Sequence, residues 1–114
     1  MAFSMVERRA IDRLLTEYCE KRVAPSVRDR LRILFRVKGE SITLVESRPS
    51  FAVRSQWIET VVAQFRRDQA SGSWCLYCAD RNSKWHPYEG LQPKKTLPPL
   101  LAEVDRDPTG IFWG

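Results

Sequence analysis

The N-terminal part of the chain repeats apolar residues at helical spacing. Residues 5–22 place them three or four positions apart, so that they share one stripe: Ala10, Ile11, Leu14, Leu15, Tyr18 and Cys19. Ser4 and Glu7 have the Ser-x-x-Glu spacing of a capping box, which satisfies backbone N–H groups at a helix start. Pro25 marks a stop. We therefore predict a helix over residues 5–22 whose apolar stripe packs into a core.

In residues 27–38 the apolar residues recur at every second position instead of every third or fourth. Over residues 27–38 apolar side chains alternate with cations, apart from an interruption at Leu34. This alternation predicts a half-buried strand with five cations in a row on its polar face: Arg28, Arg30, Arg32, Arg36 and Lys38. A turn at residues 38–41 leads to a return strand over residues 42–48. Its simplest register places Glu46 opposite Ile33, an unfavourable pair that suggests a bulge.

Three more strands and a second helix follow. We predict strands over residues 57–67, 74–79 and 84–88. A helix then begins at Thr96, which we expect to cap it, and ends before Pro108, leaving an apolar tail at residues 111–114. Short connections between strands imply an antiparallel sheet. The prediction is a single α+β domain over residues 1–114: an N-terminal helix packed on a curved antiparallel sheet of four to five strands, with a C-terminal helix and apolar tail closing the core.

The hairpin formed by the last two strands has two different faces. Either a two-residue or a four-residue turn within residues 80–83 pairs Cys78 with Trp85 and Tyr77 with His86. The face predicted for the core then holds Trp74, Leu76, Cys78 and Trp85, and the other face holds Cys75, Tyr77, Lys84, His86 and Tyr88. Aromatic rings between cations on a sheet are typical of surfaces that stack bases and hold phosphates. The alternative is that the second helix covers this face and its aromatic rings simply pack.

The net charge of +5 comes entirely from the first third of the chain. Residues 1–38 hold ten Lys or Arg and five Asp or Glu, whereas the two kinds balance in the remainder. Cations two residues apart on a strand lie roughly 6.5–7 Å apart, so the basic row could follow the phosphates of an extended nucleic acid. The alternative is a solvated face that Glu40, Glu46 or Glu59 neutralises from neighbouring strands.

Cys75-x-x-Cys78 invites a metal or redox interpretation. Both residues lie on a predicted strand, where positions three apart point to opposite faces, and no second ligand pair accompanies them. We therefore expect structural cysteines, no metal and no cofactor. Three cysteines without an apolar leader favour reduced thiols in the cytoplasm. No apolar run is long enough for a membrane span, so we expect no membrane partner.

His86 is the only histidine of the chain. A general base needs a group that orients it, and Asp80 is the nearest carboxylate in the sequence. No nucleophile motif, phosphate loop or dinucleotide fingerprint accompanies it. An enzyme that uses His86 is therefore the last of the functional hypotheses.

Several short motifs resemble those of one family. They are Glu20-Lys21-Arg22, Arg36-Val37-Lys38-Gly39, Arg48-Pro49, Trp74-x-x-Tyr77, Lys84-Trp85-His86-x-Tyr88 and the terminal Phe112-Trp113-Gly114. Together they span nearly the whole chain and resemble a bacterial family catalogued as domain of unknown function 3024. The chain departs from the pattern at Phe51 and Cys78, where the resemblance leads us to expect Trp. Cys in place of Trp favours a packing role for Cys78. The resemblance implies no activity, substrate or partner.

These observations favour a small cytoplasmic binding module with a nucleic acid as its ligand. The residues expected to bind it come from the basic row and the hairpin: Arg28, Arg30, Arg32, Arg36, Lys38, Tyr77, Lys84, His86 and Tyr88. The alternative is a module that binds another protein or a second copy of itself, because Trp, Tyr and Arg are frequent at interface hot spots.

Overall fold

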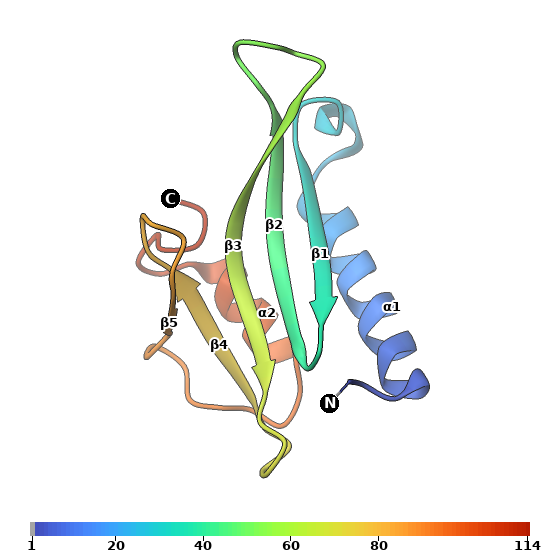
Figure 1. The fold of residues 1–114 in the computed structure, drawn as a ribbon, viewed down its shortest axis with the longest axis vertical. Coiled ribbons are helices and arrows are strands. Elements are labelled where there is room, and N and C mark those ends of the chain that lie inside the picture. Colours follow the sequence, from blue (N-terminus) through green and yellow to red (C-terminus); the bar gives the residue numbers. More distant parts are fainter. Residues whose placement is uncertain (1) are drawn as a thin grey trace.

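The computed structural model describes residues 2–114 as two helices and one five-stranded sheet (Figure 1). In chain order the elements are α1 (Met5–Arg22), a 3-10 turn η1 (Pro25–Val27), β1 (Arg32–Lys38), β2 (Ser41–Pro49), β3 (Trp57–Arg67), β4 (Trp74–Ala79), β5 (Trp85–Pro87) and α2 (Pro98–Arg106). Every strand pairs antiparallel with its neighbour in sequence, in the order β1-β2-β3-β4-β5. The α+β prediction is confirmed. Neither helix is both long enough and apolar enough to cross a bilayer within residues 2–114.

α1 begins at the predicted capping box. The Ser4 hydroxyl accepts a hydrogen bond from the Glu7 N–H at 3.1 Å, and the Glu7 carboxylate accepts one from the Ser4 N–H at 2.9 Å. The buried part of its apolar stripe is narrower than predicted and consists of Ile11 and Leu15. Ala10 is exposed, because only a narrow strip of the helix faces the sheet.

Both helices pack on the same face of the sheet. Buried residues from the two helices and the strands form one cluster, which includes Ile11, Leu15, Ile42, Leu44, Phe65, Leu76, Leu100 and Val104. In Figure 1, α2 lies behind β3 and β4 while α1 runs along β1. The opposite face of the sheet therefore carries no helix.

β1 is shorter than the alternation predicts. It begins at Arg32, because the chain first makes the 3-10 turn at Pro25–Val27, and the Val27 carbonyl then accepts both the Arg30 and Leu31 N–H groups at 2.9 Å. Arg28 and Arg30 lie in this connection, so their placement on the strand was wrong. The basic row of the sheet is reduced to its last three members.

The register of β1 against β2 is the simplest one, with Glu46 opposite Ile33. The Glu46 carboxylate accepts a hydrogen bond from Arg48 Nε at 2.8 Å, which makes this position tolerable. A register irregularity does exist, but between β2 and β3 at Leu44/Val45, where Val62 has no partner. Because the strand gains one residue there, Val62 and its neighbour Ala63 are both buried, which breaks the predicted alternation of β3.

The β4–β5 hairpin is displaced by one residue from the predicted register. Ala79 opposes Trp85 and Cys78 opposes His86, because the loop contains three residues, whereas the predicted register requires two or four. Asp80 N–H donates to the Lys84 carbonyl at 2.9 Å, and Ser83 takes a left-handed conformation with φ of 61°. A three-residue loop with its last residue left-handed is a common hairpin connection. A one-residue shift moves every side chain of β5 to the opposite face.

α2 does not begin at Thr96. Its N-cap is Leu97, whose carbonyl accepts the Leu100 and Leu101 N–H groups, and no side chain caps it. A hydroxyl at position 96 would serve the N–H groups two and three residues later, and both positions are prolines without an N–H.

The C-terminal tail folds back onto the core after α2. Asp107 ends the helix with φ of 41°, and its carboxylate accepts the Phe112 and Trp113 N–H groups at 2.9 Å. Phe112 is buried in the core cluster, and Trp113 Nε1 donates to the Val104 carbonyl at 3.0 Å. The predicted closure of the core by the tail is confirmed.

Candidate functional site

The face of the sheet without helices is the candidate site, and we call it the open face. Residues that oppose each other across strands share a face, and the registers give two rows directed away from the helices. One row is Arg36, Thr43, Gln64 and Tyr77, and the other is Lys38, Ser41, Arg66 and Cys75. The same parity places Arg32, Trp57 and Trp85 on the open face.

Arg66 of β3 and Tyr77 of β4 form a stacked pair at one end of the open face. The Arg66 guanidinium lies 3.8 Å from the centroid of the Tyr77 ring. Its Nε donates to Gln64 Oε1 at 2.6 Å, and Gln64 Nε2 donates to Thr43 Oγ1 at 2.9 Å. This chain of hydrogen bonds orients the guanidinium over the ring and leaves its two terminal nitrogens without an acceptor within residues 2–114.

A second stacked pair lies at the other end of β1. The Arg32 guanidinium is 4.0 Å from the centroid of the Trp57 ring, at the base of the β2–β3 loop. Its Nε makes a long hydrogen bond to the Arg28 carbonyl at 3.4 Å. The open face thus presents two arginine side chains that are each supported by an aromatic ring.

Only one cation of the open face has a carboxylate partner in the part of the chain that the structure describes. Arg36 Nη1 and Nη2 donate to the two oxygens of Glu59 at 2.7 and 2.5 Å, and this pairing lowers the pKa of Glu59. The predicted neutralisation by Glu59 therefore applies to Arg36. Glu46 pairs with Arg48 and Glu40 with Arg67, so neither neutralises the open face. Arg32, Lys38 and Arg66 have no carboxylate partner among residues 2–114.

The predicted hairpin surface is divided between the two faces of the sheet. Tyr77 lies on the open face as predicted, and Trp85 joins it there instead of packing in the core. Tyr88 lies on the helix side, where its hydroxyl donates to Glu103 Oε2 at 2.6 Å and its ring contacts Phe112. This hydrogen bond raises the pKa of Tyr88 to about 12. The one-residue shift of register causes these corrections.

Lys84 lies at the turn of the same hairpin and His86 lies in β5 opposite Cys78, so both are outside the open face. Lys84 is exposed, and its N–H donates to Asp80 Oδ1 at 3.0 Å. His86 Nε2 lies 2.8 Å from Asp80 Oδ2, which confirms Asp80 as its neighbour. Hydrogen bonding to His86 is the main cause of the lowered pKa of Asp80. Asp80 thus closes the turn, and the imidazole remains 59% exposed at the edge of the sheet.

The cysteines occupy the positions predicted for a strand. Cys75 lies on the open face and Cys78 is buried in the core, so their side chains point in opposite directions. Burial raises the pKa of Cys78, and it raises the pKa of Cys19 to about 11. No group of three His, Cys, Asp or Glu side chains within residues 2–114 is arranged to hold a metal ion.

Sequence reasoning missed Arg66, Trp57 and Trp85 as members of the open face. The sequence does indicate that Arg66 belongs to a polar face, because polar and apolar residues alternate around it in β3 as they do in β1. The sequence does not indicate the face of Trp85, because that face depends on the length of the preceding turn. No glycine marks the left-handed position of that turn.

Comparison with protein families gives one result. The family model described as "Domain of unknown function (DUF3024)" matches residues 3–114. Comparison with curated proteins and with solved structures found no match.

Proposed function

The chain belongs to this family of unknown function, and from its own surface we propose that it is a binding module that holds single-stranded nucleic acid on the open face. The observation that carries the proposal is the composition of that face. Three cations that have no carboxylate partner in the described part of the chain, Arg32, Lys38 and Arg66, share a surface with the rings of Tyr77 and Trp85. Phosphates and bases need these two kinds of side chain side by side.

The dimensions of the open face suit a short single strand. Along β1, the six-residue step from Arg32 to Lys38 corresponds to roughly 20 Å, and five strands side by side are roughly 19 Å wide. Sheet surfaces of this kind stack two or three bases on their aromatic side chains. We therefore expect a binding site of a few nucleotides.

Single strands fit better than duplexes because the stacked arginines present flat surfaces. Arg66 lies over Tyr77 and Arg32 over Trp57, so the outer plane of each guanidinium is available to an unpaired base. Bases stack on guanidinium planes as well as on aromatic rings. A duplex offers phosphates but no unpaired base to such a surface.

The proposal is tested by fluorescence anisotropy with labelled oligonucleotides. Single-stranded RNA and DNA should bind at about 50 mM salt and lose affinity steeply by about 200 mM. Arg66→Gln and Arg32→Gln should each weaken binding several-fold and reduce the slope of log K against log salt by about 0.7. Arg8→Gln is the matched control, because Arg8 lies on α1 and pairs with Asp12.

Two results would contradict this function. One is the absence of binding at low salt. The other is an equal loss of affinity in Arg8→Gln, which would mean that net charge alone holds the oligonucleotide. A reducing, cytoplasmic setting accords with the proposal, because all three cysteines are unpaired.

A protein-interaction module is the second candidate, and the β2–β3 loop favours it. Phe51 is fully exposed near the tip of this loop, and Val53 and Ile58 are exposed beside it. The loop is ordered by the Ser50 hydroxyl, which accepts the Ala52 N–H at 3.2 Å. Light scattering of the wild-type protein and of Phe51→Ala at micromolar concentration tests self-association. If the wild-type protein is strictly monomeric, self-association is excluded. If Phe51→Ala associates as the wild type does, the β2–β3 loop is not the surface through which copies associate.

A further inference from the structure

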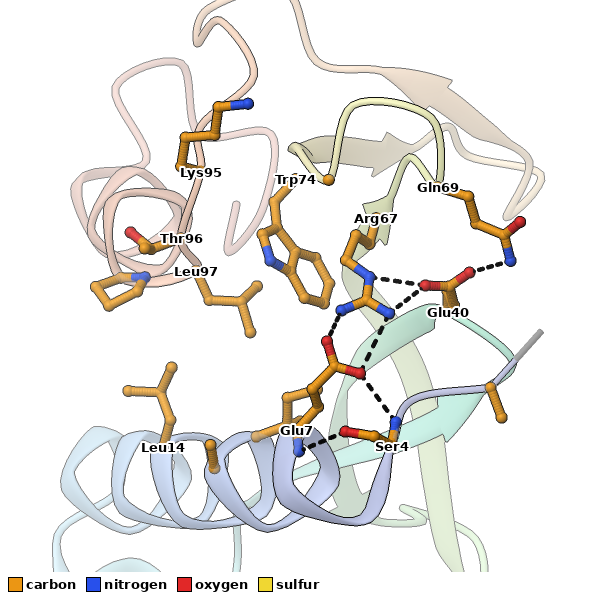
Figure 2. Close-up of a pocket in the computed structure, with 15 residues that line it drawn as sticks. Ser4, Glu7, Leu14, Glu40, Arg67, Gln69, Trp74, Lys95, Thr96 and Leu97 are labelled. Atoms are coloured by element: carbon orange, nitrogen blue, oxygen red, sulfur yellow. Dashed lines mark hydrogen bonds and ion pairs between the residues drawn. The ribbon is translucent and has the colours of Figure 1, made fainter.

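A cleft of about 900 Å³ lies on the helix side of the sheet, away from the open face (Figure 2). Its apolar walls come from α1, with Ile11 and Leu14, and from the start of α2, with Leu97 and Pro98. The Trp74 ring lies between these two walls at the start of β4. Clefts of this volume with mainly apolar walls and a few polar groups are typical of small-molecule sites.

Trp74 brings an unused hydrogen-bond donor to this cleft. The residue is 7% exposed, yet its indole N–H has no acceptor within residues 2–114. No side-chain nitrogen or oxygen fully buried in this part of the chain lacks a partner, so the indole nitrogen is accessible from the cleft. Figure 2 shows it on the edge of the ring that faces Leu97, away from Arg67. Buried indole groups usually have a partner, so a molecule in the cleft that offers an acceptor would supply it.

The Trp74 ring is held in place by its neighbours, which gives this donor a fixed direction. The Phe3 ring stacks on it with the two centroids 5.6 Å apart, and the Arg67 guanidinium lies 6.0 Å from its centroid. The backbone of Trp74 pairs with that of Lys94 through hydrogen bonds of 2.6 and 3.0 Å. A donor that is already ordered loses little conformational entropy when a ligand accepts its hydrogen bond.

The indole N–H has no second donor beside it. Figure 2 shows the Thr96 hydroxyl and the Lys95 ammonium directed away from the indole nitrogen and from each other. Lys95 Nζ instead donates to the Ser71 carbonyl at 3.1 Å. A carboxylate that meets one neutral donor loses its hydration without compensation, whereas a carbonyl oxygen is satisfied by one hydrogen bond. The cleft therefore favours a neutral acceptor over an anion.

The charged side chains of the cleft are paired with one another. The Arg67 guanidinium donates to the carboxylates of Glu7 and Glu40, and the Gln69 amide also donates to Glu40. The positive charge of the N-terminus acts on Glu40 as well. Two carboxylates are thus balanced by two cationic groups, and this end of the cleft has no excess charge that would attract an ionic ligand.

From this arrangement we infer that the cleft binds a neutral, apolar small molecule with one carbonyl group, such as a ketone or an ester. The carbonyl oxygen accepts the hydrogen bond of Trp74 Nε1, and the apolar body lies between Leu14 and Leu97. A ligand without an acceptor would bury the indole N–H unpaired, which costs free energy. The site lies on the helix side of the sheet, so it is independent of the open face and of any nucleic acid bound there.

The test records the indole N–H signals of the protein by ¹⁵N–¹H NMR during titration with cyclohexanone. The spectrum of Trp74→Phe identifies the Trp74 signal by its absence. Cyclohexanone to about 10 mM should move the Trp74 signal saturably. The Trp113 signal is the internal control and should stay, because Trp113 Nε1 already donates to the Val104 carbonyl.

Two molecules with the same ring test the choice of a neutral acceptor. Cyclohexylamine is a cation without an acceptor and should leave the Trp74 signal in place. Cyclohexanecarboxylate has acceptors but carries a negative charge, so it should bind about tenfold more weakly than cyclohexanone.

Variants then separate the hydrogen bond from the apolar walls. Trp74→Phe keeps an aromatic ring but loses the donor, so cyclohexanone affinity, followed at the Leu14 backbone N–H, should fall several-fold. Ala10→Phe adds a ring at an exposed position that lines the cleft, and the ring should block binding. Thr16→Phe adds the same ring at an exposed position of α1 that does not line the cleft, so this matched control should bind as the wild type does.

Four results would overturn the inference. They are the absence of a saturable shift of the Trp74 signal with cyclohexanone, equally tight binding of cyclohexylamine or cyclohexanecarboxylate, unchanged affinity in Trp74→Phe, and equal affinity of Ala10→Phe and Thr16→Phe. The last comparison decides the matter if Trp74→Phe does not fold, because both of its substitutions are at exposed positions.

Discussion

Arg67 joins three parts of the chain through one guanidinium. It comes from the end of β3 and contacts Glu7 on α1 and Glu40 in the β1–β2 turn, with its side chain 19% exposed. The rings of Phe3 and Trp74 lie 4.7 and 6.0 Å from it. Hydrogen bonds from Arg67 lower the pKa of Glu7 to about 2 and also lower the pKa of Glu40. Arg67 therefore links the first turn of α1 to the sheet electrostatically.

The Glu7–Arg67 contact predicts a specific dependence of stability on pH. A carboxyl whose pKa is lowered by folding stabilises the protein above its ordinary value of 4.5, and this contribution is lost as pH falls toward about 2. Glu7→Gln removes the charge but keeps an acceptor for the Ser4 N–H. The melting temperature of wild type should exceed that of Glu7→Gln at pH 7, and the difference should shrink as pH falls below 4.5 toward about 2.

Glu20→Gln is the control for this measurement. Glu20 lies exposed on α1 and has no ion-pair partner within residues 2–114. Its substitution should leave the melting curve unchanged across the same range of pH. A difference between wild type and Glu7→Gln that stays constant from pH 7 to about 2 would refute the electrostatic role of Arg67.

The β4–β5 hairpin shows how one turn determines the exposure of a whole element. Asp80 accepts the N–H groups of Asn82 and Lys84, which holds a three-residue loop in place. The left-handed Ser83 ends that loop, and β5 then pairs one residue later than a shorter turn allows. Trp85 reaches the open face and Tyr88 reaches the core for this reason.

Replacing Ser83 with glycine should stabilise the protein. A left-handed conformation costs a residue with a Cβ roughly 1–2 kcal/mol, and glycine adopts it freely. We expect Ser83→Gly to raise the free energy of unfolding by about 0.5–1 kcal/mol in urea titrations, after the greater flexibility of unfolded glycine is allowed for.

Asn82→Gly is the matched change one position earlier. Asn82 does not have a positive φ, so glycine there only adds unfolded-state flexibility and should lower the free energy of unfolding by about 0.5 kcal/mol. Equal effects of the two glycine variants would show that the left-handed conformation of Ser83 carries no cost.

The molecule as a whole is built around one core between the sheet and a single layer of helices. Tyr18 of α1 donates to Asp105 of α2 at 2.8 Å, so the helices contact each other over the sheet. The C-terminal tail also contacts α1, because the Arg22 guanidinium lies 4.3 Å from the centroid of the Trp113 ring. All of this covering lies on one side, and it leaves the open face to solvent.

The tail should contribute strongly to global stability. Phe112 is buried and contacts Tyr88, so Phe112→Ala creates a cavity and should lower the free energy of unfolding by about 3–5 kcal/mol. The adjacent Ile111 is exposed, and Ile111→Ala should change the free energy of unfolding by less than about 0.5 kcal/mol. Chemical unfolding of both variants measures the difference. If Phe112→Ala lowers the free energy of unfolding by less than about 1 kcal/mol, the tail does not contribute strongly to global stability.

Much of the fold could be predicted from the chain because its signals are local. The capping box of Ser4 and Glu7 satisfies groups within one helical turn, and period-two alternation reflects the pleat of a single strand. Cys75 and Cys78 separate to opposite faces by the same local rule. The predicted positions of Trp85 and Tyr88 failed because they depended on the length of a turn, where one residue more or less reverses a face. Those of Arg28 and Arg30 failed because the 3-10 turn delays the start of β1 to Arg32.

The pattern of apolar residues thus determines which segments become helices or strands, and it places the basic residues of β1 on one side of the sheet. Spacing alone does not indicate which face the helices cover, since that depends on how distant segments pack. Only the tertiary structure brings Arg66 and Tyr77 beside the β1 cations and joins Glu7, Glu40 and Arg67. It also leaves the indole N–H of Trp74 facing a cleft between two helices that are far apart in the sequence.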